Sequence, residues 1–456
     1  MTTTFPRTAP STLGIDARGI AALLDALETT PGVEPHGLVL LRHGQVAAEG
    51  WWAPYRPDRV HLLYSLSKSF TAAAVGIAVR AGLVDLDATV LSYFPELDGE
   101  VTDDRSRRMR VRHVLAMASG HREETLDRAT AIDPTNTVRG FLLLPPDEEP
   151  GSVFAYNQPC TYTLGEIVRR VSGVSLVEYL RPRLLDPLGI DDLAWRRDDR
   201  GAELGFSGCH ATTESVAKLG QLYLQRGVWD GERILDEDWV AQATSTQVEN
   251  PAEENPDWRQ GYGFQFWMAR HGFRGDGAYG QFCVVLPEQD VVLAVTGQSL
   301  DMQAVLDAVW RHLLPAVDAA DPDPAADAGL EARLASLGLP PVGGGRLPDL
   351  AAAGPFHGEG LDRLAFTPEG DGWRATIDVD GGTLTVPVGE GAWAEEGPLA
   401  ASGATAPDGT VLVDVRFVET PHLLHLRLDT SAGSVTAVWE TQPLHDGPLS
   451  LRRPAD

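Results

Sequence analysis

The stretch Tyr64-Ser65-Leu66-Ser67-Lys68, followed by a long uncharged run, constrains this chain more than any other. Residues 72–79 are all Ala, Val, Gly or Ile, which predicts a buried helix. Positions three apart share one face of a helix, so the Lys68 amine should lie beside the Ser65 hydroxyl. A buried lysine is costly unless it has a task. The spacing therefore predicts a serine nucleophile with a lysine as its base.

Ser65 is the candidate nucleophile because it alone has a lysine three residues further on, whereas Ser67 and Ser69 do not. The N-terminus of the following helix adds backbone N–H groups and a positive dipole end, which suit a developing oxyanion. A four-residue pattern with two free positions also recurs by chance. The alternative interpretation is an N-capping serine beside a solvated lysine.

Composition excludes several classes of partner. The chain has 456 residues, enough for two or three domains, and a net charge of −28 that argues against binding to nucleic acid or anionic membranes. No apolar run reaches the length of a membrane span, and the first residues show no basic and apolar signal segment. We therefore expect a cytoplasmic protein, and the acidic Ala/Gly/Pro/Arg-rich composition suggests a bacterial source.

The cysteines Cys160, Cys209 and Cys283 lie far apart without metal-ligand spacing. An odd number without a pattern fits a reducing compartment and structural thiols. The sequence predicts neither a metal site nor a cofactor.

Strand and helix signals alternate in a way that predicts an α+β fold. The order is a helix, a hairpin, a helical middle, further strands and a closing helix. Strands from both ends of this region must then meet in one antiparallel sheet flanked by helices, with a helical subdomain beside it. The predicted elements are helices at 15–27, 161–171, 212–226 and 304–314, a short helix ending in a loop within 111–121, and strands at 37–42, 45–50, 261–267, 273–277, 281–287 and 291–296.

Tyr156 lies on a loop just before the predicted helix at 161–171, where a phenol can point into a cleft. A tyrosine or tyrosinate beside a lysine can serve as general base and later as acid toward the leaving group. A loop tyrosine that only packs is the alternative. His113 and His121 are open to two interpretations, as bases or ligands and as capping or packing residues.

A second domain follows the first. Residues 318–327 form an Ala/Asp/Pro tract that predicts a linker, with a short helix at 330–337. Short alternating runs then predict an all-β domain, a barrel or sandwich of lipocalin-like type that docks at or near the cleft. We expect the domains to be 1–316 and 350–456, joined by 317–349. The predicted strands are 373–379, 383–388, 411–418, 423–428 and 435–439, and the expected large core members are Trp373, Trp393, Phe417 and Trp439.

An ordered set of short motifs over residues 15–316 resembles the serine β-lactamase and penicillin-binding-protein superfamily. The resemblance is nearest to class C β-lactamase-related esterases, D-peptidases and 6-aminohexanoate-dimer-hydrolase-like amidases. The motifs are Ser65-Leu66-Ser67-Lys68, Asp85-Leu86-Asp87, Arg112-His113-Val114-Leu115, Ser119-Gly120-His121, Phe154-Ala155-Tyr156-Asn157-Gln158, Leu164-Gly165, Pro187-Leu188-Gly189, Gly261-Tyr262-Gly263 and Tyr279-Gly280-Gln281-Phe282.

Two departures from the family pattern affect substrate binding. The second motif, usually Tyr-x-Asn, reads Tyr156-Asn157-Gln158, and Gln158 can still donate an amide hydrogen bond. The third motif, usually Lys-Thr-Gly or His-x-Gly, lies in a strand that contains Arg274-Gly275-Asp276-Gly277. Arg274 either holds a substrate carboxylate or is solvated.

The resemblance implies acylation of Ser65 by an ester, amide or peptide substrate, with release to water or an amine and with weak or no β-lactamase activity. It implies an oxyanion hole from the Ser65 N–H and an N–H of the 274–277 strand. Two alternatives remain: a penicillin-binding-protein-type thioesterase that releases or cyclises a nonribosomal peptide, and a non-catalytic ligand sensor. The sequence does not indicate an oligomeric state.

Overall fold

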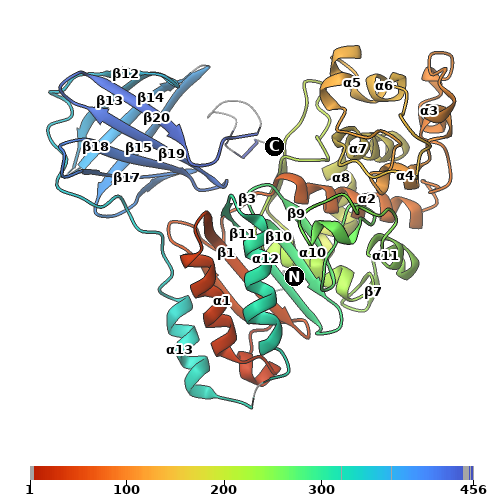
Figure 1. Ribbon diagram of the computed structural model, residues 1–456, viewed down its shortest axis with the longest axis horizontal. Helices are drawn as coiled ribbons and strands as arrows, with labels where there is room; N and C mark the ends of the chain where they lie inside the picture. The colour runs from red at the N-terminus through yellow and green to blue at the C-terminus, as the bar shows by residue number, and fades with distance from the viewer. Residues whose placement is uncertain are drawn as a thin grey trace.

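The fold is described from a computed structural model over residues 5–319, 321–370, 372–379, 381–444, 451 and 453–454. A β-sheet with helices on both faces, a mainly helical part and a separate all-β part make up the molecule (Figure 1). No helix in these ranges combines the length and the apolar character needed to cross a membrane.

The central sheet joins strands from both ends of the first 316 residues, which confirms the α+β prediction. Strand β1 pairs antiparallel with β2 on one side and with β11 on the other, and Leu38 lies opposite Val295. The order across the sheet is β2 (Gln45–Trp51), β1 (Val33–Arg42), β11 (Val291–Ser299), β10 (Gln281–Leu286), β9 (Phe273–Gly277) and β8 (Trp267–Met268).

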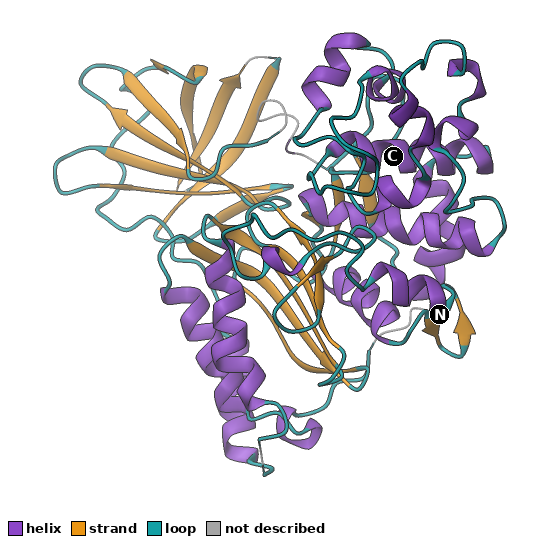
Figure 2. Ribbon diagram, turned by 45° about the vertical axis from the view of Figure 1, so that its right-hand side comes forward, coloured by secondary structure: helices purple, strands orange, loops and turns teal. Residues whose placement is uncertain are grey.

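Helices cover both faces of this sheet, because its strands are apolar on both sides (Figure 2). One face packs against α1 (Ala17–Thr29) and α12 (Met302–Ala308), the latter continuing as a π-helical turn, Val309–Leu313, and a 3₁₀ turn, Leu314–Ala316. The other face packs against α10 (Thr213–Leu224), whose N-cap Thr212 accepts a hydrogen bond from Ser215 N.

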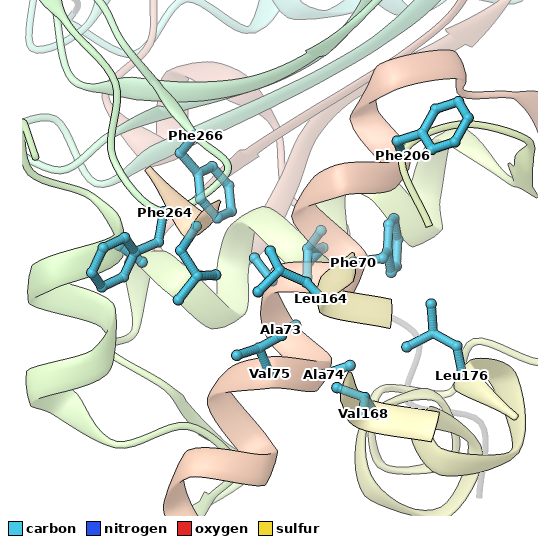
Figure 3. Packing of buried hydrophobic residues seen from close by; sticks show 14 of the residues in the cluster. Phe70, Ala73, Ala74, Val75, Leu164, Val168, Leu176, Phe206, Phe264 and Phe266 are labelled. Atoms are coloured by element: carbon cyan, nitrogen blue, oxygen red, sulfur yellow. The ribbon is translucent and has the colours of Figure 1, made fainter. Parts of the chain in front are cut away.

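The helical part surrounds α2 (Ser67–Arg80), whose uncharged run is buried as predicted. Figure 3 shows Phe70, Ala73 and Ala74 of this helix packed near Leu164 and Val168. The other helices are α3 (Asp104–Arg108), α4 (Val111–Leu115), α5 (Leu126–Ile132), α6 (Thr137–Leu143), α7 (Gln158–Ser172), α8 (Leu176–Leu180), α9 (Asp186–Leu188) and α11 (Glu237–Ala243). Short strands also occur here: β3 (His61–Leu62), β4 (Leu193–Trp195), β5 (Cys209–Ala211), β6 (Val228–Trp229) and β7 (Glu232–Arg233).

The strand predicted at 261–267 is wrong except at its end, where β8 begins. Gly261 has a φ of 93°, and a Cβ on Gly263 would lie 2.1 Å from the carbonyl oxygen of Ala243. The glycines therefore bend the chain around α11, and the alternating aromatic residues pack into the helical core instead of a sheet.

The C-terminal strands close into a barrel, because β15 pairs both with β14 and with β17. Of the predicted core members, Phe417 is buried, while Trp373 and Trp439 are partly buried against the barrel core. The strands are β12 (Phe356–Gly358), β13 (Leu361–Glu369), β14 (Gly372–Val379), β15 (Gly382–Glu390), β16 (Ala394–Glu396), β17 (Leu399–Thr405), β18 (Val411–Phe417), β19 (His422–Asp429) and β20 (Ser434–Trp439).

Trp393 is not a member of the barrel core, contrary to expectation. It packs against the core cluster of α1 and the central sheet, and its indole N–H donates to Leu339 O at 2.9 Å. A large apolar ring can be buried between two domains as well as inside one. The residue type alone therefore could not show which of these positions Trp393 takes.

The segment between the sheet domain and the barrel is not an open spacer. It contains α13 (Pro324–Leu334), which begins at Pro324 rather than at residue 330 and packs along α1. Leu330, Leu337 and Leu339 are buried in the core cluster beneath it. The apolar leucines therefore hold this stretch against the first domain.

Candidate active site

Ser65 lies in a 3₁₀ turn, Tyr64–Leu66, that leads directly into α2, and so just before the α-helix rather than inside its first turn. The Lys68 ammonium nitrogen is 3.2 Å from Ser65 Oγ, as the three-residue spacing predicts. Ser67 faces away, since its hydroxyl donates to Tyr64 O at 2.5 Å and accepts from Cys209 N at 3.0 Å. Ser65 is therefore the serine that the lysine can deprotonate.

Lys68 is buried, with 1% of its surface exposed. Its Nζ also donates to Gln158 Oε1 at 2.7 Å and to Phe206 O at 2.8 Å. Burial lowers the Lys68 pKa to about 7, although the nearby carboxylates of Asp276 and Glu124 partly oppose this shift. Much of the lysine is therefore uncharged near neutral pH, which a general base requires.

Tyr156 forms one wall beside the lysine. Its ring stacks on Trp267 with centroids 5.3 Å apart, and Lys68 Nζ lies 4.7 Å from the tyrosine centroid. Burial, assisted by the charge of Asp276, holds the Tyr156 pKa well above its usual value, while a hydrogen bond with Ser65 acts in the opposite direction. Tyr156 is thus a neutral phenol at rest, and Lys68 is the group able to accept the first proton.

Gln158 and Asn157 point to different sides of the loop. Gln158 accepts the lysine hydrogen bond and lines the cavity beside Ser65. Asn157 is fully buried, and its Oδ1 accepts from Thr125 N at 3.0 Å and Thr125 Oγ1 at 2.9 Å. Asn157 does not line the cavity in this structure, and it fixes the loop that carries Tyr156.

Arg274 takes neither of the two roles considered for it. Its side chain is fully buried, donates from Nε to Asp276 Oδ2 at 3.1 Å and from Nη1 to Met268 O at 2.9 Å. The guanidinium also lies 4.2 Å from the Trp258 ring centroid. The Asp276 carboxylate neutralises the arginine, and so no free third-motif cation faces Ser65 from this strand.

Gly275 and Gly277 let β9 approach the nucleophile turn closely. A Cβ on Gly275 would lie 2.6 Å from Ser69 Oγ, and one on Gly277 would lie 2.0 Å from Leu63 O. Any side chain at these positions would separate the strand from α2. The glycines thus bring backbone N–H groups near the end of β9 beside Ser65, where an oxyanion hole would need them.

A cavity of about 260 Å³ opens over the nucleophile. Among the residues lining it none is Lys, Arg or His, whereas Glu124 and Asp127 are both acidic and exposed. Its lining consists of Tyr64, Ser65, Glu124, Leu126, Asp127, Gln158, Phe206, Ser207 and Leu444. A larger cavity, of about 690 Å³, lies between β2 and α13 and contains none of the predicted site residues.

The two histidines considered as bases or ligands make structural contacts instead. His121 bonds to Ser119 Oγ and Leu144 O, and His113 accepts from Arg110 N, so both are packing or capping residues. Phe206 and Leu444 belong to the cavity wall but lie in segments without a motif, so no sequence pattern points to them.

The family model described as Beta-lactamase matches residues 20–316. The chain belongs to the beta-lactamase family. A 6-aminohexanoate-dimer hydrolase of Paenarthrobacter ureafaciens is 32% identical over 243 residues, 48% of this chain and 61% of the relative. Esterase EstB of Burkholderia gladioli is 27% identical over 210 residues, 40% of this chain and 53% of the relative. This chain therefore spans less than two thirds of these relatives' lengths.

The likeness to a solved structure extends over most of this chain, beyond the first domain. The octameric penicillin-binding protein homologue from Pyrococcus abyssi aligns over 90% of this chain and 97% of its own length, with a TM-score of 0.51 and 17% identity. At this identity the likeness concerns the fold alone.

Proposed function

We propose that this protein is a serine hydrolase that cleaves an ester or amide through a Ser65 acyl-enzyme. The contact between Lys68 Nζ and Ser65 Oγ, made by a buried lysine with a lowered pKa, is the observation that carries this proposal. The names of the esterase and amide-hydrolase relatives support the same class of reaction.

The reaction begins when Ser65 Oγ attacks the substrate carbonyl carbon and its proton passes to Lys68 Nζ. The carbonyl oxygen becomes an oxyanion that the Ser65 N–H and an N–H near the end of β9 would stabilise. The bond to the leaving group then breaks, and the leaving oxygen or nitrogen takes a proton delivered through Tyr156 from Lys68. Water repeats the sequence on the acyl-enzyme and regenerates the serine.

Substrates without a required carboxylate fit the site best. Arg274, the candidate cation, is bonded inward to Asp276, and the cavity mouth carries Glu124 and Asp127. A β-lactam presents a carboxylate that such a site would not hold, so we expect weak or no β-lactamase activity. Neutral esters and amides, including peptides, are the substrates that we propose.

A fluorophosphonate probe tests the assignment. Wild-type protein and Ser67→Ala should become labelled, whereas Ser65→Ala should not, and hydrolysis of p-nitrophenyl acetate should be lost with the label. Nitrocefin turnover should stay far below ester turnover. Labelling of Ser65→Ala at full strength would refute the nucleophile and with it the proposed chemistry.

A further inference from the structure

The barrel contacts the two segments that form the candidate active site. His422, at the start of β19, reaches Tyr64 next to the nucleophile, and Tyr279 after β9 donates to Gln442 O at 2.5 Å. The rings of Tyr64, Tyr279 and His422 lie 5.5 to 5.8 Å apart in pairs. One barrel edge thus packs against both the nucleophile turn and the strand opposite it.

The direction of the His422 hydrogen bonds follows from their partners. His422 Nδ1 lies 2.9 Å from Thr441 O, and a carbonyl can only accept, so Nδ1 carries a proton. The other ring nitrogen, Nε2, then accepts from the Tyr64 hydroxyl at 2.5 Å. Leu444 N in turn donates to the same hydroxyl oxygen at 3.4 Å. Both of these contacts to the Tyr64 hydroxyl come from the C-terminal domain.

Tyr64 holds a backbone conformation that needs such support. Its φ of 47° lies in the left-handed region, which costs a non-glycine residue free energy unless the surroundings fix it. Ser65 is the next residue, so its hydroxyl position depends on this conformation. Only 1% of Tyr64 is exposed.

The barrel is held firmly enough to act in this way. Arg416 makes a two-point ion pair with Glu34 of β1 at 2.6 and 2.9 Å, with both side chains mostly buried. Arg416 also lies 5.0 Å from the ring centroid of Trp393, which packs into the first domain. A main-chain bond from Leu62 N to Glu419 O, at 2.7 Å, joins the barrel to the strand just before the nucleophile turn.

We propose, on the basis of the hydrolase function above, that the barrel completes the active site. His422 is a positioning residue that fixes the Ser65 hydroxyl through Tyr64. Leu444, which is 54% exposed and lines the cavity with Leu126 and Phe206, selects the acyl group by its size.

The positioning role is tested by His422→Leu and Tyr64→Phe, which remove the same hydrogen bond from opposite sides. The acylation rate constant for p-nitrophenyl acetate is measured on each variant. The fraction of molecules with a reactive Ser65 is determined beforehand by titrating a separate sample with the fluorophosphonate. Each variant should acylate about 10- to 100-fold more slowly with little change in KM, because a displaced nucleophile lowers the rate and not the binding. The double variant should be little slower than either single one, since one bond is shared.

His425→Leu is the matched control, because His425 lies on the same strand and pairs with Asp414 and Glu440 away from the site. It should acylate at the wild-type rate. Wild-type acylation by His422→Leu, or fully additive losses in the double variant, would overturn the positioning role. Thermal unfolding of each variant separates a displaced serine from a destabilised fold.

The selectivity role is tested with p-nitrophenyl esters from acetate to octanoate. Leu444→Ala should raise kcat/KM for the long esters relative to acetate by about tenfold, because the shorter side chain leaves room for a longer acyl chain. An unchanged ratio would remove Leu444 from substrate choice. Failure of the hydrolase proposal itself would look different. In that case the fluorophosphonate would still label Ser65→Ala, a variant whose barrel is unchanged.

Discussion

The protonation of Lys68 should control the rate of ester cleavage near neutral pH. With a pKa of about 7, half of the lysines are neutral at pH 7. For an ordinary lysine the neutral fraction at that pH would be only about 1 in 2,500. We expect kcat/KM for a neutral ester to rise with pH, with a midpoint near 7, and then to reach a plateau. Lys68→Arg should abolish this rise, because a guanidinium stays protonated.

The free energy of unfolding should also depend on the protonation of Lys68. Burial lowers the folded-state pKa of Lys68, whereas the unfolded chain keeps the proton to about pH 10.4. Between these values the unfolded state binds more protons, so the free energy of unfolding rises with pH. Below about pH 7 both states are protonated and the full cost of the buried charge remains.

Lys68→Met removes this cost and its pH dependence. The stability of the variant relative to wild type should therefore fall by about 2 kcal/mol between pH 7 and pH 9. Urea unfolding at each pH measures this difference, and kcat/KM between pH 5 and 9 measures the rate. A flat rate profile, together with a pH-independent stability difference, would refute the lowered pKa and the base role.

Three other perturbations test separate parts of the site. Tyr156→Phe should slow acylation by about 100- to 10,000-fold with little change in KM, and a variant that keeps most of its turnover would remove this phenol from the proton path. Gly277→Ala should lower both the unfolding midpoint and kcat, because its Cβ would lie 2.0 Å from a carbonyl oxygen of the nucleophile turn, whereas Gly329→Ala, with no heavy atom within 4 Å, should do neither. Arg416→Met should cost about 3–5 kcal/mol in urea unfolding, since it leaves Glu34 charged and mostly buried, and a loss below about 1 kcal/mol would show that this ion pair does not anchor the barrel.

Local spacing explains why the centre of the site could be predicted from the sequence. Ser65 and Lys68 lie in consecutive turns, so their contact needs only a helix and an apolar run. Gln158 reaches the same lysine from the first residue of α7, next to the tyrosine that marks its loop. The positions of these residues are determined largely by the residues next to them in the sequence.

The walls of the cavity could not be predicted in this way. Leu444 and Phe206 meet above Ser65 only after the barrel and the helical part are in place, and neither segment carries a pattern that depends on the other. The role of Arg274 could not be predicted for the same reason. Its packing against Trp258 decides that it pairs with Asp276 and not with a substrate. Tertiary contacts over long sequence separations leave little local signal.

The pairing of β1 with β11 has a consequence for biosynthesis. The two strands are neighbours in the interior of the sheet, yet one is translated near the beginning of the first domain and the other near its end. Until β11 leaves the ribosome, β1 lacks the strand with which it pairs along most of its length. Such long-range pairing closes slowly, and the exposed surfaces invite aggregation. Growing chains of this protein should therefore depend on chaperones for most of their synthesis, and they should gain a reactive serine only after residue 299 has emerged.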